Sequence, residues 1–267
     1  MRQHLFFFLH GILIVFVVTS CTNHKISDRE IKVGGYRIVG EITDDSIYNG
    51  NVRFYKISSN KLAEETQYDK GVMNGKRSLF YENGTVLSTS YYEKGKLIGD
   101  NLFFDSSGQI SNKTFWYYDL RVGPSIDYLN SDPIRYSFYT FENELIYSLD
   151  YANLRDKKIV DINDNFFRLV GYDSTDYWQG QQRNVGVEYK IYLLNPPKFN
   201  FDYDIVEVDS SYQVIKVIDK LNSNLPFAFF TISASTSAKY MNAVRLKVVD
   251  SLNSKNNYLM YKKLIEY

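Results

Sequence analysis

Carboxylates and amides are the main side chains in this sequence that could do chemistry. The sequence contains one Cys, Cys21, and three His, which are His4, His10 and His24. Everything after residue 24 therefore lacks the residues for Ser-His-Asp or Cys-His catalysis and for nearly every zinc site. Any catalysis in that part of the chain would have to use Asp and Glu.

The densest group of oxygen-bearing side chains is the run Asp161-Ile162-Asn163-Asp164-Asn165. Alternating oxygen ligands in a loop can bind Ca²⁺, which takes about six to eight oxygens. The run resembles the interdomain calcium motif of cadherins, although the other calcium-binding segments of that family are not present at suitable spacings. The sequence allows either a calcium site at Asp161, Asn163 and Asp164 or an Asn-Asp turn, since both residue types tolerate left-handed backbone.

A pair of carboxylates could also hydrolyse a glycosidic bond. That mechanism needs two carboxyl groups about 5–10 Å apart, one of them with a raised pKa. The sequence reveals neither property, so a carboxylate-dependent glycan hydrolase stays an alternative to our prediction of a protein that is not an enzyme. We also expect no cofactor, because no glycine-rich loop leads into a predicted helix. We expect no nucleic-acid partner, because the 31 Lys and Arg are balanced by 31 Asp and Glu.

The elements that would position these side chains follow a repeat of about 24 residues. Four glycines mark its period: Gly50, Gly75, Gly99 and Gly123. An aromatic residue follows each glycine after five positions: Tyr55, Phe80, Phe104 and Tyr128. A second aromatic series has the same period: Tyr68, Tyr92 and Trp116. Aromatic residues make up 16% of the sequence, which favours β-structure.

Each unit of the repeat predicts a β-hairpin. In the clearest unit, residues 75–99, Asn83-Gly84 predicts a tight type I′ turn, because that turn needs positive φ at both central residues. The flanking runs are rich in Tyr, Phe, Val and Thr, which strands prefer. One hairpin cannot bury its aromatic face alone, so we expect the units to stack into an elongated sheet. Ser59 and Asp119 replace glycines of this pattern.

The order of aromatic pair, Asn-Gly, Tyr and Gly-Lys resembles the bacterial variant of the MORN repeat, over about residues 48–130. This resemblance implies a non-catalytic scaffold or interaction surface and no particular ligand. Such repeats recur in secreted and lipid-anchored bacterial proteins and are often labelled antitoxin-like. An antitoxin- or immunity-like protein that binds one partner is therefore a further alternative.

Two strand faces could carry the interaction. We expect the aromatic series that begins with Tyr55 to form the core of the repeat. We expect an envelope protein or glycan to bind the opposite face, and the predicted partner-binding residues are Leu79, Tyr81, Tyr91 and Phe103.

The first twenty residues have the pattern of a secretory signal peptide. Arg2 precedes an apolar run over residues 5–18, and small residues follow it. Val18-Thr19-Ser20-Cys21 resembles the bacterial lipoprotein signal, which implies cleavage before Cys21 and lipidation of that cysteine. Thr22 follows instead of the Asp that indicates inner-membrane retention. We therefore expect a lipid-anchored protein of the bacterial cell envelope, at the outer membrane by analogy.

The glycine period fades beyond about residue 133, and seven short strand-like runs follow residue 165. This spacing is typical of a small antiparallel sandwich. One run, residues 185–197, is similar to a strand motif in envelope β-sandwich domains of the Bacteroidetes type. We therefore predict an all-β chain with an elongated antiparallel β-hairpin repeat sheet followed by a small immunoglobulin-like β-sandwich. The predicted divisions are a signal peptide (1–20), a tether (21–35), the MORN-like repeat domain (36–160) and the sandwich (161–267).

Overall fold

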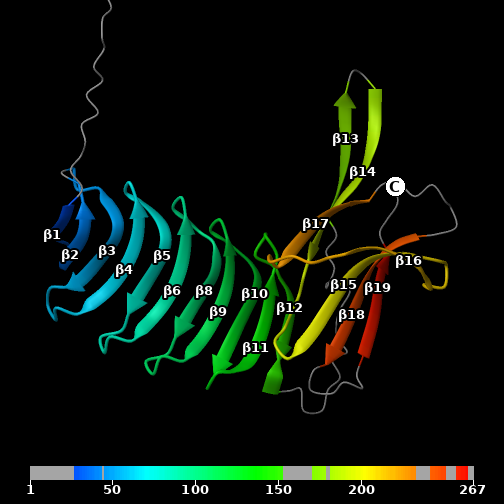
Figure 1. Cartoon of the computed structure of the whole chain (residues 1–267). Helices are drawn as coiled ribbons and strands as arrows, with labels where there is room; N and C mark the ends of the chain where they lie inside the picture. The colour runs from blue at the N-terminus through cyan, green and yellow to red at the C-terminus, as the bar shows by residue number, and fades with distance from the viewer. Residues whose placement is uncertain are drawn as a thin grey trace, which may run out of the picture.

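A computed structural model describes residues 27–43, 45–152, 170–178, 181–232, 241–250 and 257–263. Side chains are described for residues 29–43, 45–152, 190–230 and 241–247. As predicted, this part of the chain is all-β, with one long antiparallel sheet followed by smaller sheets (Figure 1). Over the same ranges, we find no helix with the length and apolar character needed to span a membrane.

The long sheet has twelve strands, and they pair in the order in which they occur in the chain (Figure 1). The short strand β7 pairs with β6 only. The first strand lies within residues 21–35, the expected tether. The strands are β1 (Ser27–Val33), β2 (Tyr36–Ile42), β3 (Tyr48–Lys56), β4 (Leu62–Asp69), β5 (Val72–Phe80), β6 (Val86–Glu93), β7 (Lys96–Leu97), β8 (Gly99–Phe104), β9 (Ile110–Tyr117), β10 (Leu120–Leu129), β11 (Asp132–Tyr139) and β12 (Leu145–Asp150).

Two kinds of turn alternate between these strands. Turns of type I′, with positive φ at both central residues, occur at Lys70-Gly71 (48° and 84°) and Lys94-Gly95 (49° and 81°). At Asn83-Gly84 only the glycine has positive φ (88°), and its N–H donates to the carbonyl of Tyr81 at 2.9 Å. This is a type I turn closed by a left-handed glycine, not the predicted type I′ turn.

The type I′ turns also connect successive units of the repeat. The N–H of Gly71 donates to the carbonyl of Tyr48 (2.8 Å), and that of Gly95 donates to the carbonyl of Met73 (2.8 Å). Asp119 continues the series with a bond to the carbonyl of Leu97 at 3.0 Å. One backbone bond of this kind per unit helps fix the period of about 24 residues.

Each repeat glycine has an aromatic cross-strand partner, and for the first three glycines that partner belongs to the second aromatic series. The pairs are Gly50 with Tyr68, Gly75 with Tyr92, Gly99 with Trp116 and Gly123 with Tyr139. All four glycines have positive φ, between 60° and 114°. Such glycines bend strands and allow a ring to lie across the backbone, so they help the long sheet to coil.

The C-terminal strands form two further antiparallel sheets, one of three strands and one of four. Residues 214–220 form the strand β16, which lies at an edge of the four-stranded sheet. Figure 1 shows the hairpin of β13 and β14 projecting from the rest of this region. The strands are β13 (Val170–Trp178), β14 (Gln181–Tyr192), β15 (Phe199–Val208), β16 (Val214–Lys220), β17 (Phe227–Ile232), β18 (Met241–Asp250) and β19 (Asn257–Lys263).

The largest hydrophobic core joins the end of the long sheet to the C-terminal sheets. Its buried residues are Val122, Ile126, Tyr136, Phe138, Tyr147, Leu149, Ile191, Tyr192, Leu194, Phe199, Tyr203, Ile205, Leu221, Phe227, Val244 and Leu246. A much smaller cluster, Ile38, Ile42 and Val52, lies near the first strands. The burial of apolar area therefore increases toward the C-terminal end of the long sheet.

The first aromatic series contributes less to the core than the sequence predicts. Tyr55, Phe80, Phe104 and Tyr128 are all half-buried, and of these Tyr128 packs against the largest core. Equivalent residues of successive units are two strands apart, about 9.5 Å. That distance is too long for their rings to stack on one another, so side chains of the intervening strands must fill the space.

Candidate functional site

The two faces of the long sheet are defined here by the register of the strands. The Lys113 face carries a cross-strand row that runs from β5 to β11: Ser78, Thr89, Leu102, Lys113, Ile126 and Tyr136. The Asn101 face carries the neighbouring row on the opposite side: Thr66, Arg77, Ser90, Asn101, Thr114 and Ser125.

The structure divides the predicted partner-binding residues between these faces. Leu79 and Phe103 lie on the Asn101 face, because both pair with Ser88. Tyr91 lies two residues from Thr89, on the Lys113 face, with 50% of its surface exposed. Tyr81 follows β5, and its hydroxyl donates to the carbonyl of Phe104 at 2.8 Å. The four side chains therefore do not form one binding surface.

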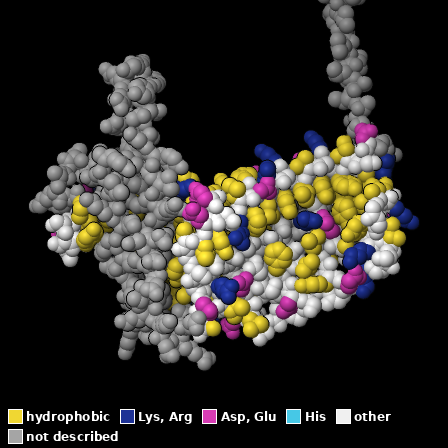
Figure 2. Space-filling view, turned by 180° about the vertical axis from the view of Figure 1, so that it is seen from behind, with side chains coloured by type: hydrophobic (Ala, Val, Ile, Leu, Met, Phe, Trp, Pro, Cys, Tyr) yellow, Lys and Arg dark blue, Asp and Glu magenta, His cyan; other side chains and the backbone are white. Residues whose placement is uncertain are grey.

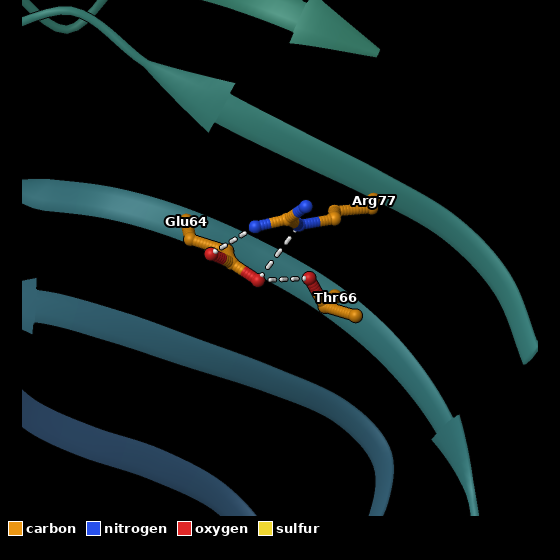
Figure 3. Close-up of polar contacts among 3 residues, drawn as sticks. All are labelled: Glu64, Thr66 and Arg77. Carbon is orange, nitrogen blue, oxygen red and sulfur yellow. Dashed lines mark hydrogen bonds and ion pairs between the residues drawn. The ribbon is translucent and has the colours of Figure 1, made fainter. Parts of the chain in front are cut away.

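The Asn101 face holds a network of charged and hydroxyl groups near its N-terminal end (Figure 3). Arg77 donates from Nε and from a terminal nitrogen to the two carboxylate oxygens of Glu64, at 3.0 and 2.9 Å. The Thr66 hydroxyl donates to the same carboxylate at 2.8 Å. The bonds to Glu64 raise the pKa of Arg77 further above its ordinary value. Both oxygens of Glu64 are thus occupied, and the network ties β4 to β5.

Farther along the same face, the Ser90 hydroxyl donates to the side-chain oxygen of Asn101 at 2.9 Å. Both residues are buried, with 9% and 8% of their surface exposed. A buried polar pair that satisfies its own hydrogen bonds holds neighbouring strands in register. These polar side chains therefore use their hydrogen-bonding groups to stabilise the sheet and not to bind a ligand.

A cleft of about 440 Å³ lies where the Lys113 face meets the C-terminal region. One wall comes from β8 to β11 of the long sheet, and the opposite wall comes from residues near β14 and β15 and from the segment before β17. The lining residues are Asp100, Lys113, Phe115, Pro124, Ile126, Tyr136, Leu193, Leu194, Asn195, Phe201, Tyr203, Leu221, Asn222, Ser223, Asn224, Leu225 and Pro226. The cleft therefore brings together segments that lie far apart in the sequence.

Two buried tyrosines fix the inner part of the cleft. The hydroxyl of Tyr136 accepts the N–H of Asn195 at 3.1 Å, and the hydroxyl of Tyr203 donates to the carbonyl of Leu194 at 2.9 Å. Burial raises the pKa of both phenols well above the ordinary value near 10. Both are therefore neutral at physiological pH. The bond to Tyr136 ties the 193–195 segment to the long sheet, and the bond from Tyr203 ties it to β15.

The charged side chains of the cleft neutralise each other. Nζ of Lys113 lies 2.6 Å from a carboxylate oxygen of Asp100. No other charged residue lines this cleft in the part of the chain that the structure describes. It therefore holds one carboxylate, whereas the hydrolase alternative requires two facing ones.

Gly123 allows the outer wall to approach the long sheet. A Cβ atom at this position would lie 2.4 Å from Cγ of Pro226, and the φ of Gly123 is +82°. The sequence identifies Gly123 as a repeat glycine but gives no sign that Pro226 packs on it. The segment 221–226, which forms the wall, is recognisable in the sequence only as a short run with Asn, Ser and Pro between two strand-like runs.

A second, more open hollow of about 670 Å³ lies near β2 and β3. Its lining includes Gly40, Gly50 and the ion-paired Arg53, whose Nε lies 2.8 Å from Glu65. Figure 2 shows hydrophobic side chains spread along one side of the long sheet with charged groups between them. These features describe a surface suited to contacts over a wide area.

The remaining predicted sites lie outside the described residues. They are the lipidation site Cys21 and the candidate calcium ligands Asp161, Asn163 and Asp164. Within the described ranges, no group of three or more His, Cys, Asp and Glu side chains is arranged to hold a metal ion.

Comparisons with known proteins do not identify a family for this chain. No family model matches the chain, and no curated protein matches it. Among solved structures, the chain is similar to one described as "Crystal structure of GtfA/B complex bound to UDP and GlcNAc", with a TM-score of 0.30 and 11% identity. The match covers 45% of this chain and 25% of that chain, so this chain spans about a quarter of the matched one. A likeness this distant carries no argument about function.

Proposed function

We propose that this chain is a non-catalytic scaffold of the bacterial cell envelope that binds a protein or glycan through its MORN-like sheet. In this proposal, lipid on Cys21 anchors the chain to the membrane, by default the outer one. The observation that carries the binding role is the cleft at the end of the Lys113 face. Its polar groups are paired or neutral, and an arrangement of that kind suits recognition better than bond cleavage.

The anchoring part of the proposal is tested by comparing the wild-type chain with Cys21→Ala after expression in a bacterial host. We expect the mature wild-type chain to begin at Cys21, to carry acyl mass and to partition into detergent. The variant is expected to lose the acyl mass and to enter the aqueous phase. An unmodified wild-type chain, or cleavage elsewhere, would remove the basis for the envelope assignment.

The binding part of the proposal is tested by crosslinking on intact cells. A photoreactive phenylalanine analogue at Tyr91 reports on the Lys113 face, and the same analogue at Phe103 reports on the Asn101 face. Both side chains are exposed, at 50% and 39%, so they form a matched pair. We expect a discrete adduct from Tyr91 and a weaker one from Phe103. The absence of adducts at both positions would contradict binding by the sheet.

A further inference from the structure

We propose that the cleft between the Lys113 face and the 221–226 segment binds the neutral end of an oligosaccharide. This inference rests on the proposed scaffold function and specifies the ligand class of its cleft. The volume of about 440 Å³ lies within the range of roughly 300–1,000 Å³ that is typical of small-molecule sites. A terminal mono- or disaccharide unit is of suitable size.

Aromatic side chains supply the inner surface that a sugar ring needs. Phe115 contributes from the long sheet and Phe201 from β15, and both rings are half-buried. Tyr136 and Tyr203, which are 0% and 5% exposed, support this surface from the core. Pyranose rings have an apolar side of C–H groups, and rigid aromatic rings offer contact area to it at low cost in conformational entropy. Tyr136 and Tyr203 are held by hydrogen bonds to the 193–195 segment, so this inner surface is formed before any ligand arrives.

Amide and hydroxyl groups surround the opening. Asn222, Ser223 and Asn224 are exposed on the 221–226 segment, and Asn195 is exposed beside them. Each asparagine side chain offers both donors and acceptors, as a sugar hydroxyl does, so the two kinds of group are complementary. The Ser223 hydroxyl accepts the N–H of Leu225 at 3.0 Å, and this bond shapes the segment.

The charges favour an uncharged ligand. Asp100 and Lys113 form an ion pair 2.6 Å long at the margin of the cleft, and the other lining groups are neutral. An anionic sugar would have to compete with Asp100 for Lys113, and a cationic ligand would have to compete with Lys113 for Asp100. Neither exchange adds a new charge pair, so charge brings no gain in affinity.

The topology disfavours an extended peptide as the occupant. The commonest way for a sheet to bind an extended peptide is to add it as a strand at a free edge. Strands β8 to β11 are interior strands with neighbours on both sides, so their backbone groups already pair within the sheet. The walls of the cleft therefore present side chains and little free backbone to a ligand.

The test uses the full chain in detergent and a panel of neutral trisaccharides: maltotriose, cellotriose and N,N′,N″-triacetylchitotriose. Saturation-transfer NMR and calorimetry are run beside anionic trigalacturonate and the neutral peptide Gly-Phe-Gly. We expect saturable binding of at least one neutral sugar and weaker binding of both comparison ligands. The double variant Asn222→Ala, Asn224→Ala should weaken binding of that sugar about tenfold or more, the effect of losing one or two hydrogen bonds.

Ile215→Ala is the matched control, because Ile215 lies in the same C-terminal region as the 221–226 segment, is 50% exposed and does not line the cleft. Its affinity for the sugar should stay within about twofold of wild type. Failure of every neutral sugar to bind, preferred binding of the peptide or of the anionic sugar, or equal losses in the control and the double variant would each overturn the inference. If crosslinked adducts persist while the sugars fail, the scaffold proposal survives and the glycan assignment does not.

Discussion

At the scale of single residues, Gly99 and Gly123 are a matched pair for testing how much the packing of Pro226 contributes to stability. Their φ values are nearly equal, at 78° and 82°, but their surroundings differ. A Cβ atom at Gly99 would meet no heavy atom within 4 Å, whereas one at Gly123 would meet Pro226 at 2.4 Å. Substitution by alanine should cost about 1–2 kcal/mol of backbone strain at either site. Gly123→Ala should cost about 1–3 kcal/mol more, because the outer wall of the cleft must move.

Urea unfolding of the two variants, monitored by circular dichroism, measures this difference. The same variants should also differ in sugar binding, since only Gly123→Ala displaces Pro226. Equal free energies of unfolding would mean that Pro226 does not restrain the wall against Gly123.

A second prediction at the residue scale concerns Tyr147 and the stability of the folded protein at alkaline pH. Burial raises the pKa of Tyr147 to about 12, so the folded protein holds this proton more tightly than the unfolded chain, whose tyrosine pKa is near 10. The resulting stabilisation, up to about 3 kcal/mol, is complete below pH 10 and is lost as the pH rises toward 12.

Thermal unfolding between pH 9 and pH 12 tests this sign. Tyr136 and Tyr203 shift in the same direction and add to the slope of stability against pH. Tyr147→Phe should make the slope shallower, whereas Tyr91→Phe, at an exposed ring, should leave it unchanged. A slope that both variants change equally would contradict the assignment to Tyr147.

At the scale of the hairpin, the structure explains why the turn at Asn83-Gly84 differs from its prediction. The side-chain oxygen of Asn83 accepts the N–H of Thr85 at 3.0 Å, and its amide donates to the carbonyl of Ser106 in the next unit at 3.0 Å. These bonds favour a type I turn with a left-handed glycine. The sequence identifies the turn but not its type, because one of the bonds that select it comes from 23 residues away.

The neighbouring turn of the same kind depends on Asp105. Its carboxylate accepts the Ser107 hydroxyl (2.6 Å) and the N–H groups of Ser107 and Gln109 (2.9 and 3.0 Å). These bonds, the Ser107 hydroxyl first, lower the pKa of Asp105 below its ordinary value. Their stabilisation is therefore present above the ordinary pKa near 4 and is lost as the pH falls through the lowered pKa.

Asp105→Ala should raise the hydrogen-exchange rate of amides in the β8–β9 hairpin at neutral pH. The β1–β2 hairpin offers a comparison within the same molecule, and exchange there should stay as in wild type; the β5–β6 hairpin is less suitable because Asn83 bonds to Ser106 in the Asp105 turn. Exchange that rises equally in both hairpins would indicate global destabilisation and would contradict a local role for Asp105.

Strand parity explains the division of the predicted partner-binding residues. Because Leu79 pairs with Ser88, odd-numbered residues of β5 share a face with even-numbered residues of β6. Tyr91 therefore lies on the opposite face from Leu79. The sequence predicts strands and their approximate period, but face assignments depend on bulges that shift the register, such as the one between Leu79 and Phe80.

At the scale of the whole molecule, the long sheet and the C-terminal sheets share one core. Its members come from β10 to β12 and from strands and connecting segments beyond residue 180. A chain that ends at residue 152 should therefore expose Tyr136, Phe138 and Tyr147, bind the dye ANS and aggregate. A chain that lacks residues 27–43 should remain folded beyond its new edge, because the cluster of Ile38, Ile42 and Val52 is separate from this core.

Size-exclusion chromatography and ANS fluorescence of the two truncated chains distinguish these outcomes. A soluble, ANS-negative chain ending at residue 152 would show that the long sheet is independent of the C-terminal sheets.

The sequence predicts the long sheet but does not predict the cleft. The repeat predicts an elongated sheet because its local pattern recurs every 24 residues or so. The cleft depends on contacts such as that between Gly123 and Pro226, which are about a hundred residues apart and leave no periodic signal. Local patterns thus predict the fold class, while long-range packing decides where a recessed site forms.

The unequal ends of the long sheet have a consequence for how such chains can vary. The C-terminal end is buried in the shared core, while each unit toward β1 contacts mainly its neighbours along the sheet. Duplication or loss of one hairpin by recombination within the gene would therefore change the sheet by two strands, about 9.5 Å, and leave the cleft intact. The number of repeat units therefore determines, in steps of one hairpin, the distance between the first strand and the cleft.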